Sequence, residues 1–164
     1  MDNTPIVAKS SYIFFSFNSY IHIGFNFYIL IVMSEEFEQI SLKPGFMKHN
    51  GGILFKTISK NEYKFKATIK ENHLNAAGIT HGGFIAALVD AGVGTAAHRS
   101  TGENLCVTIS LELKFISSVQ LNQELIGLVK VQKKTKSLVF LTCELKTDGK
   151  IAATASGIWK IIKK

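Results

Sequence analysis

One apolar stretch of the chain carries residues whose types suit acyl transfer. His81 is followed by Gly82 and Gly83, and Asp90 is the only charged side chain in the segment that continues to Ala97. A glycine at a helix start leaves its backbone N–H uncovered, and such an N–H can hold a carbonyl oxygen that gains negative charge. A carboxylate in apolar surroundings is seldom there for stability, because its burial is costly unless it is paired. The stretch therefore predicts an electrophile-binding end and a buried carboxylate two turns along one helix.

The helix that must position these groups is expected from Gly82 to about His98, with Thr80 as a candidate N-cap. Its apolar stripe consists of Ile85, Leu88, Val89, Gly92 and Ala96. Alanine and glycine cover most of its remaining surface, and a helix that is apolar or small all round should be enclosed by other structure.

Alternating residues predict the strands that enclose this helix. The strands are expected at residues 53–59, 63–70, 107–115, 124–132, 137–147 and 150–162. Asp148-Gly149 is a strong hairpin signal between the last two strands, and a short helix within residues 34–49 should end before Pro44. The order predicts an α+β fold, a curved antiparallel sheet wrapped around one long central helix.

The residues around the helix start resemble those of a known family, the hotdog-fold acyl-CoA thioesterases of the phenylacetate-pathway (PaaI-like) type. That family shares an Asn, a short glycine-containing loop, His-Gly-Gly, and an Asp seven residues after the last Gly. The matching residues are Asn75, Gly78, His81, Gly82, Gly83 and Asp90. The resemblance runs from about Ile53 to the C-terminus. It implies the hotdog fold and hydrolysis of an acyl-CoA thioester to a carboxylic acid and free CoA, with no cofactor beyond the CoA of the substrate. It also implies homodimers or homotetramers with active sites at the subunit interface.

Roles for the catalytic residues follow from their types and from this resemblance. Asp90 is either a general base that activates water or a nucleophile that forms a mixed anhydride. The Gly82 N–H is expected to polarise the thioester carbonyl, Asn75 to orient the thioester or the water, and Thr108 to aid the attacking water. Simpler explanations also exist. Asn75 suits a turn, Thr108 suits any strand, and His81 is as readily a capping residue as an acid–base group.

Contacts to the substrate beyond the reacting atoms are expected from Gly83 and from the turn that holds Lys134, Lys136 and Ser137, where relatives touch the phosphates of CoA. Lysines at an exposed hairpin turn are also ordinary. No further His, Cys or carboxylate lies nearby at metal-ligand spacing, so we expect no metal site. The loop from Ile116 to Asn122 departs from the family, which often carries a Pro and then a Gly there.

Composition sets the broad class of the protein. The 164 residues are 46% apolar and 19% charged, which excludes general disorder and fits one domain. The net charge of +7 suits a phosphorylated ligand, nucleic acid or anionic lipid. Because the lysines are spread over strand faces, we expect neither a nucleic-acid nor a membrane partner. The two cysteines, Cys106 and Cys143, favour free thiols in a reducing compartment, the cytoplasm.

Residues 1–32 differ from the remainder, because the chain has no charge from Ser10 to Val32. A signal anchor after Lys9 is one explanation, but polar residues interrupt the run that a bilayer span requires. We favour an atypical extension outside the functional chain, which would begin at Met33 and form a single hotdog thioesterase domain over residues 33–164.

Three other functions stay open at this stage. A hotdog hydratase or dehydratase would rely on a histidine with a carboxylate partner in a different sequence setting. An acyl-CoA-binding protein without catalysis would be expected to lack Asp90. A membrane-anchored protein would rest on residues 10–32 alone.

Overall fold

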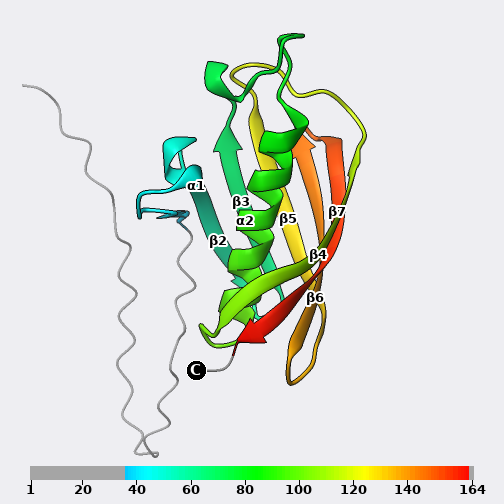
Figure 1. Ribbon diagram of the computed structural model, residues 1–164. Coiled ribbons are helices and arrows are strands. Elements are labelled where there is room, and N and C mark those ends of the chain that lie inside the picture. The colour runs from blue at the N-terminus through cyan, green and yellow to red at the C-terminus, as the bar shows by residue number, and fades with distance from the viewer. Residues whose placement is uncertain (1–35, 163–164) are drawn as a thin grey trace, which may run out of the picture. The chain divides into compact units, whose positions relative to one another are not determined.

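A seven-stranded antiparallel sheet carries one long helix across one face in the computed structural model, which describes residues 36–162 (Figure 1). The predicted extension over residues 1–32 lies outside the described residues. The strands pair in the order β1-β2-β3-β5-β6-β7-β4. The elements are β1 (Glu38–Ile40), α1 (Phe46–His49), β2 (Ile53–Ser59), β3 (Glu62–Thr68), the 3-10 turn η1 (Glu71–His73), α2 (Gly82–Ser100), β4 (Leu105–Phe115), β5 (Glu124–Lys134), β6 (Leu138–Thr147) and β7 (Lys150–Ile162). The predicted α+β hotdog arrangement is confirmed.

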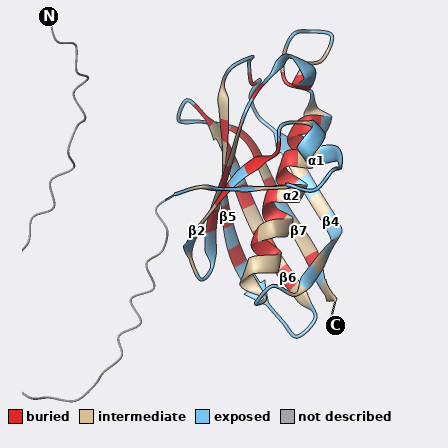
Figure 2. Ribbon diagram, turned by 90° about the vertical axis from the view of Figure 1, so that its left-hand side faces the viewer, coloured by how far each residue is buried: buried red, intermediate tan, exposed pale blue. Residues whose placement is uncertain are grey.

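The central helix α2 is buried on the stripe that the sequence predicts. Ile85, Leu88, Val89, Gly92 and Ala96 are all buried. The helix therefore lies with its larger apolar side chains against the sheet, and the red segments of the α2 ribbon in Figure 2 mark the buried residues. Burial of such a stripe supplies most of the stabilisation of a helix in a protein.

Two aromatic rings fill slots between α2 and the sheet, and each slot is made by a pair of glycines. The Phe65 ring lies between Gly92 of α2 and Gly127 of β5, where a Cβ on either glycine would overlap the ring. Nearer the end of the helix, a Cβ at Gly94 would stand 3.3 Å from Trp159 Nε1, and one at Gly157 would stand 2.6 Å from the same ring. These slots fix how closely the helix approaches the sheet.

The start of the described chain differs from the prediction. The expected short helix ending before Pro44 is wrong, because Glu38–Ile40 forms strand β1 and the four-residue helix α1 follows Pro44. Strand β1 pairs with β2, with Gln39 opposite Leu54. An open strand edge offers backbone partners that local sequence patterns do not reveal.

Strand β4 departs from simple alternation. Its pairing with β7 shifts register between Thr108 and Ser110. As a result Val107 and Ile109 are 43% and 56% exposed, whereas Leu111 and Leu113 pack against the core. The strand forms one edge of the sheet and is largely exposed (Figure 2).

The hairpin between β6 and β7 agrees with the prediction. Asp148 and Gly149 have φ angles of 48° and 76°, as a two-residue turn of the type favoured in hairpins requires. Thr147 pairs with Lys150 directly beside the turn.

Substitution of Gly127 by Ala should destabilise the fold through the Phe65 slot. Overpacking of a core typically costs ~1–3 kcal/mol, and urea unfolding followed by Trp159 fluorescence measures the change. Adding Phe65→Leu should recover part of the loss, so the double variant should be more stable than the sum of the two single changes predicts. Strictly additive effects would show that the ring and the glycine do not share one space.

Candidate active site

The turn that begins α2 is built by His81. The predicted N-cap Thr80 is wrong, because His81 is the N-cap and its Nδ1 accepts a hydrogen bond of 2.8 Å from the Gly83 N–H. Thr80 is buried instead and donates its hydroxyl to the Val119 carbonyl at 2.8 Å. A Cβ at position 83 would stand 2.9 Å from His81 Nδ1. Gly83 therefore makes room for the cap, and its own N–H is already bonded.

The Gly82 N–H is the donor of this turn that has no hydrogen-bond partner among the described residues. No hydrogen bond within residues 36–162 uses it. The Phe115 ring lies 3.5 Å from the place where a Cβ of Gly82 would stand. Gly82 and Asn75 together line a pocket of about 330 Å³ whose other walls include Ile85 and Ile116. The pocket combines an apolar wall with uncovered backbone, as a site for an acyl thioester requires.

Asn75 is a turn residue and also presents a free donor. Its Oδ1 accepts hydrogen bonds from the N–H groups of Ala77 at 2.9 Å and Ile79 at 3.4 Å. Because both partners are donors, the oxygen of the amide must face the loop and the nitrogen must face away from it. No hydrogen bond within residues 36–162 uses Nδ2. The loop thus fixes the direction in which this NH₂ group can donate.

Asp90 and Thr108 form the second part of the site. Thr108 Oγ1 donates a hydrogen bond of 2.6 Å to Asp90 Oδ1. Thr108 pairs directly with Trp159, whose side chain is buried, so both side chains project toward α2. The sequence places the two residues eighteen positions apart, and the fold brings them together.

The expectation that Asp90 is buried is wrong for the single chain. Asp90 and Thr108 are both exposed, because β4 is the edge strand and no further strand of residues 36–162 covers that flank of α2. Gly82 and Asp90 are eight residues apart on one helix, which corresponds to ~12 Å along the axis. The two parts of the site within one chain therefore cannot act on the same carbonyl group.

His73, a buried histidine that the sequence analysis missed, contacts the residues that begin α2. His73 is 2% exposed, its ring stacks on Phe84 at 3.7 Å between centroids, and its carbonyl accepts the His81 N–H at 2.8 Å. Its Nδ1 accepts the Lys70 N–H at 3.1 Å, and its Nε2 lies 3.1 Å from the Asn50 carbonyl. The imidazole is therefore neutral with the proton on Nε2. No motif in the sequence marks it.

The predicted phosphate contacts lie at the far end of α2. Lys134 Nζ donates to the Ser100 carbonyl at 2.6 Å, so this ammonium stabilises the helix C-terminus. Lys136 and Ser137 are exposed in the β5–β6 turn. Eighteen residues of helix separate Ser100 from Gly82, which amounts to ~27 Å.

The cysteines, the metal-ligating residue types and the helices of residues 36–162 bear on three other functions: thiol catalysis, metal binding and membrane insertion. Both cysteines are free, and burial raises the pKa of the Cys143 thiol to about 12, so it does not form a thiolate nucleophile. Among residues 36–162 no group of His, Cys, Asp and Glu side chains has the arrangement of a metal site. None of the helices in that range is long and apolar enough to cross a membrane.

Comparison with known proteins identifies the family of the chain. Residues 77–153 match the model of the thioesterase superfamily. Acyl-coenzyme A thioesterase 13 of Homo sapiens is 32% identical over 124 residues, which cover 74% of this chain and 88% of that protein. The chain belongs to the thioesterase superfamily.

Solved structures of this superfamily share the fold. Zebra fish thioesterase superfamily member 2 is similar with a TM-score of 0.67 and 21% identity, covering 73% of this chain and 88% of that one. The E. coli PaaI protein from the phenylacetic acid degradation operon has a TM-score of 0.65 and 19% identity, covering 71% and 83%. The predicted resemblance to PaaI-like hotdog thioesterases is confirmed.

Protonation of His73 should loosen the helix start of this thioesterase-superfamily chain. Burial is the main cause that lowers the pKa of His73 below its usual value of 6.5, so the folded state favours the neutral ring. The unfolded chain therefore binds more protons than the folded chain as the pH falls through 6.5. The contribution of neutral His73 to stability should be complete above pH 6.5 and be lost as the pH drops below it.

Imidazole NMR titration should give a His73 midpoint below 6.5. Urea unfolding should show lower stability at about pH 5.5 than at about pH 7.5, by an amount that His73→Gln reduces. A His73 midpoint at or above 6.5 would contradict the account.

Proposed function

We propose that the protein is an acyl-CoA thioesterase, which hydrolyses a thioester to a carboxylic acid and free CoA. The observation that carries this proposal is the 2.6 Å hydrogen bond from Thr108 to Asp90 on an exposed face. A hydroxyl that donates to Oδ1 holds the carboxylate in one orientation and leaves Oδ2 for a water molecule. Membership of the thioesterase superfamily supports the reaction class.

The reaction we propose uses Asp90 as the general base. Asp90 takes a proton from water while the water oxygen attacks the thioester carbon. The carbonyl electrons move to oxygen, and the Gly82 N–H and Asn75 Nδ2 stabilise that oxyanion. Collapse of the tetrahedral intermediate restores the carbonyl, breaks the C–S bond and releases the CoA thiolate, which takes up a proton. The same geometry permits Asp90 to attack as a nucleophile and form a mixed anhydride. His81 keeps the capping role that its bond to Gly83 supports.

The complete site is proposed to form between two copies of the chain. Asp90 and Gly82 are too far apart within one helix, at ~12 Å, to act together. Strand β4 is the last strand of the sheet within residues 36–162, and Leu105, Val107 and Ile109 on it are exposed. A two-fold axis beside β4 would cover this edge and bring Gly82 of one chain to Asp90 of the other. By resemblance, such dimers pair further into tetramers.

Two further assignments belong to the same proposal. Lys136 and Ser137 contact CoA phosphates from the β5–β6 turn, whereas Lys134 is held by the helix end. The protein works in the cytoplasm, because Cys106 and Cys143 are free thiols. An acyl-CoA-binding protein without turnover and a hydratase remain the alternatives that the following measurement separates.

Asp90→Asn should reduce thioesterase turnover by ~10²–10⁴, since the amide cannot accept the proton from water. Thiol release from a panel of acyl-CoAs, reported by DTNB, measures the rate. Asp148→Asn is the matched control, because Asp148 is the other described aspartate and lies in the β6–β7 turn. Acyl-CoA binding by calorimetry should persist in the Asp90 variant. Turnover within a few-fold of the parent would refute the role of Asp90, and binding without turnover in the parent would favour the non-catalytic alternative.

A shared site should permit complementation between two inactive variants. Asn75→Ala lacks the amide donor and Asp90→Asn lacks the base, so a mixed dimer contains one intact site built from the two unaltered halves. Mixing the variants should restore up to about half of the activity per heterodimer, because one of its two sites is intact. Heterodimers are verified by native mass spectrometry. Verified heterodimers without recovered activity would contradict a site shared between subunits.

A further inference from the structure

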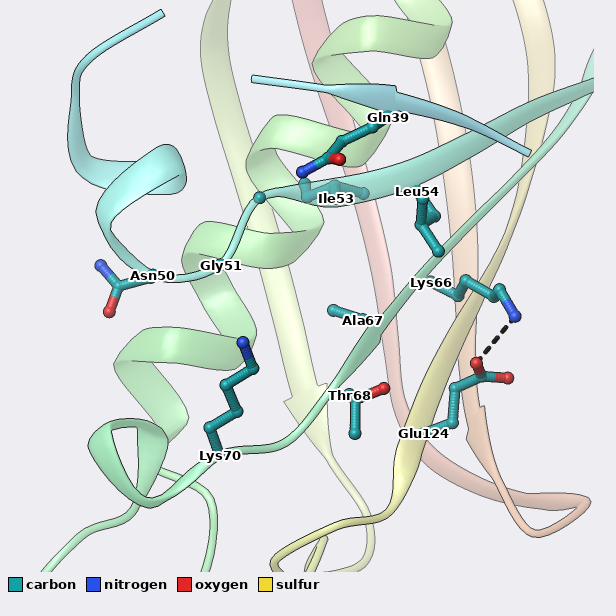
Figure 3. A pocket seen from close by; sticks show the side chains of 11 residues that line it. Gln39, Asn50, Gly51, Ile53, Leu54, Lys66, Ala67, Thr68, Lys70 and Glu124 are labelled. Carbon is teal, nitrogen blue, oxygen red and sulfur yellow. Dashed lines mark hydrogen bonds and ion pairs between the residues drawn. The ribbon is translucent and has the colours of Figure 1, made fainter. Parts of the chain in front are cut away.

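A second pocket lies where strands β2 and β3 part. The pairing of these strands ends at Leu54 opposite Lys66, but β3 continues beside β5 as far as Thr68. The chain enters β2 through Gly51 and Gly52, whose φ angles of 93° and 73° favour glycine. The opening is a pocket of about 230 Å³, shown in Figure 3.

The polar groups that remain unpaired around this pocket are mainly donors. Lys66 forms a 2.8 Å ion pair with Glu124, which neutralises the one carboxylate among the lining residues. Among the other lining side chains, no hydrogen bond within residues 36–162 uses those of Gln39, Thr68 and Lys70, and Lys70 carries the charge. A Cβ at Gly52 would stand 3.2 Å from Gln39 Nε2, and a Cβ at Gly51 would stand 3.6 Å from Lys70 Nζ. The two glycines therefore keep the space beside both donors open.

We propose that this pocket binds a small organic anion, a carboxylate or a phosphate, through the Lys70 ammonium and the Gln39 amide. The pocket has a net positive lining and an apolar floor from Ile53, Leu54 and Ala67. The ammonium group suits an anionic headgroup, and the floor suits a short hydrocarbon part. The pocket shares no lining residue with the one formed by Asn75 and Gly82.

Occupancy of the pocket is coupled to the turn that presents Gly82. Asn50 and Lys70 line the pocket, and the same two residues hold the His73 imidazole through the Asn50 carbonyl and the Lys70 N–H. His73 in turn accepts the His81 N–H and stacks on Phe84 in the first turn of α2. An anion drawn to Lys70 therefore acts on one end of a continuous hydrogen-bonded path to the helix start.

The test observes the two imidazole nitrogens of His73 by long-range ¹H–¹⁵N NMR while sodium phosphate, acetate or butyrate is added at constant ionic strength. We expect saturable shifts of the His73 signals. His98 is the internal control, because its Nδ1 bonds to the Asn104 carbonyl at the other end of α2. Lys70→Gln keeps the backbone N–H that His73 needs but removes the charge, and it should weaken binding about tenfold. Lys150→Gln, at the exposed start of β7, should leave the affinity unchanged.

Each outcome decides the proposal without reference to catalysis. Saturation by acetate and butyrate alone identifies a carboxylate site, and saturation by phosphate alone identifies a phosphate site. Equal shifts of His73 and His98, shifts that do not saturate, or shifts that survive Lys70→Gln would overturn the proposal. Gln39→Ala is the second variant, and unchanged affinity there would remove the amide from the site. An inactive enzyme would leave all of these readings intact.

Discussion

The close approach of α2 to the sheet is the constraint on which the rest of the structure depends. Phe65 fits only because Gly92 and Gly127 lack side chains. Trp159 fits because Gly157 lacks a side chain, and Gly94 leaves it further room. Interiors are packed as densely as crystals, so a single added methyl group at such a place must displace a ring or the helix. The distance from Thr108 to Asp90 is set by this packing, because Thr108 lies opposite Trp159 and Asp90 is one turn before Gly94.

The sequence predicted those elements whose pattern is local and repetitive. The α2 stripe follows from the spacing of Ile85, Leu88 and Val89, and β6 and β7 follow from alternation around Asp148-Gly149. Strand β1 was missed because three residues carry no pattern and pair only when β2 offers an edge. The register shift in β4 was missed for a similar reason, since alternation along one strand contains no information about its neighbour.

In the candidate site, too, sequence predicts what depends on local residue types and misses what depends on tertiary contacts. Gly82 and Asp90 are candidates by their types and spacing, and Asn75 is one by the family resemblance. The structure adds which of their atoms make no hydrogen bond within residues 36–162. Whether Thr80 or His81 caps α2 could not be decided from sequence, because both side chains can accept from a backbone N–H. The exposure of Asp90 was also beyond reach, since it depends on β4 being the last strand of the sheet. The His73 imidazole accepts the N–H of Lys70, three residues before it, and contacts the carbonyl of Asn50, which is distant in sequence, and no motif marks either contact.

The hydrogen bonds of Asn75 to its own loop fix the orientation of its amide dipole before any ligand enters the pocket. A polar solvent stabilises a new anion only after its dipoles have turned, and that turning consumes part of the interaction energy. Here the amide of Asn75 is already oriented, because the N–H groups of Ala77 and Ile79 hold its oxygen before any ligand is present. In the reaction proposed above, the reorganisation energy around the oxyanion would thus be met when the loop folds, before any substrate binds. The same two hydrogen bonds therefore make the surface turn rigid and preorganise the amide dipole of Asn75.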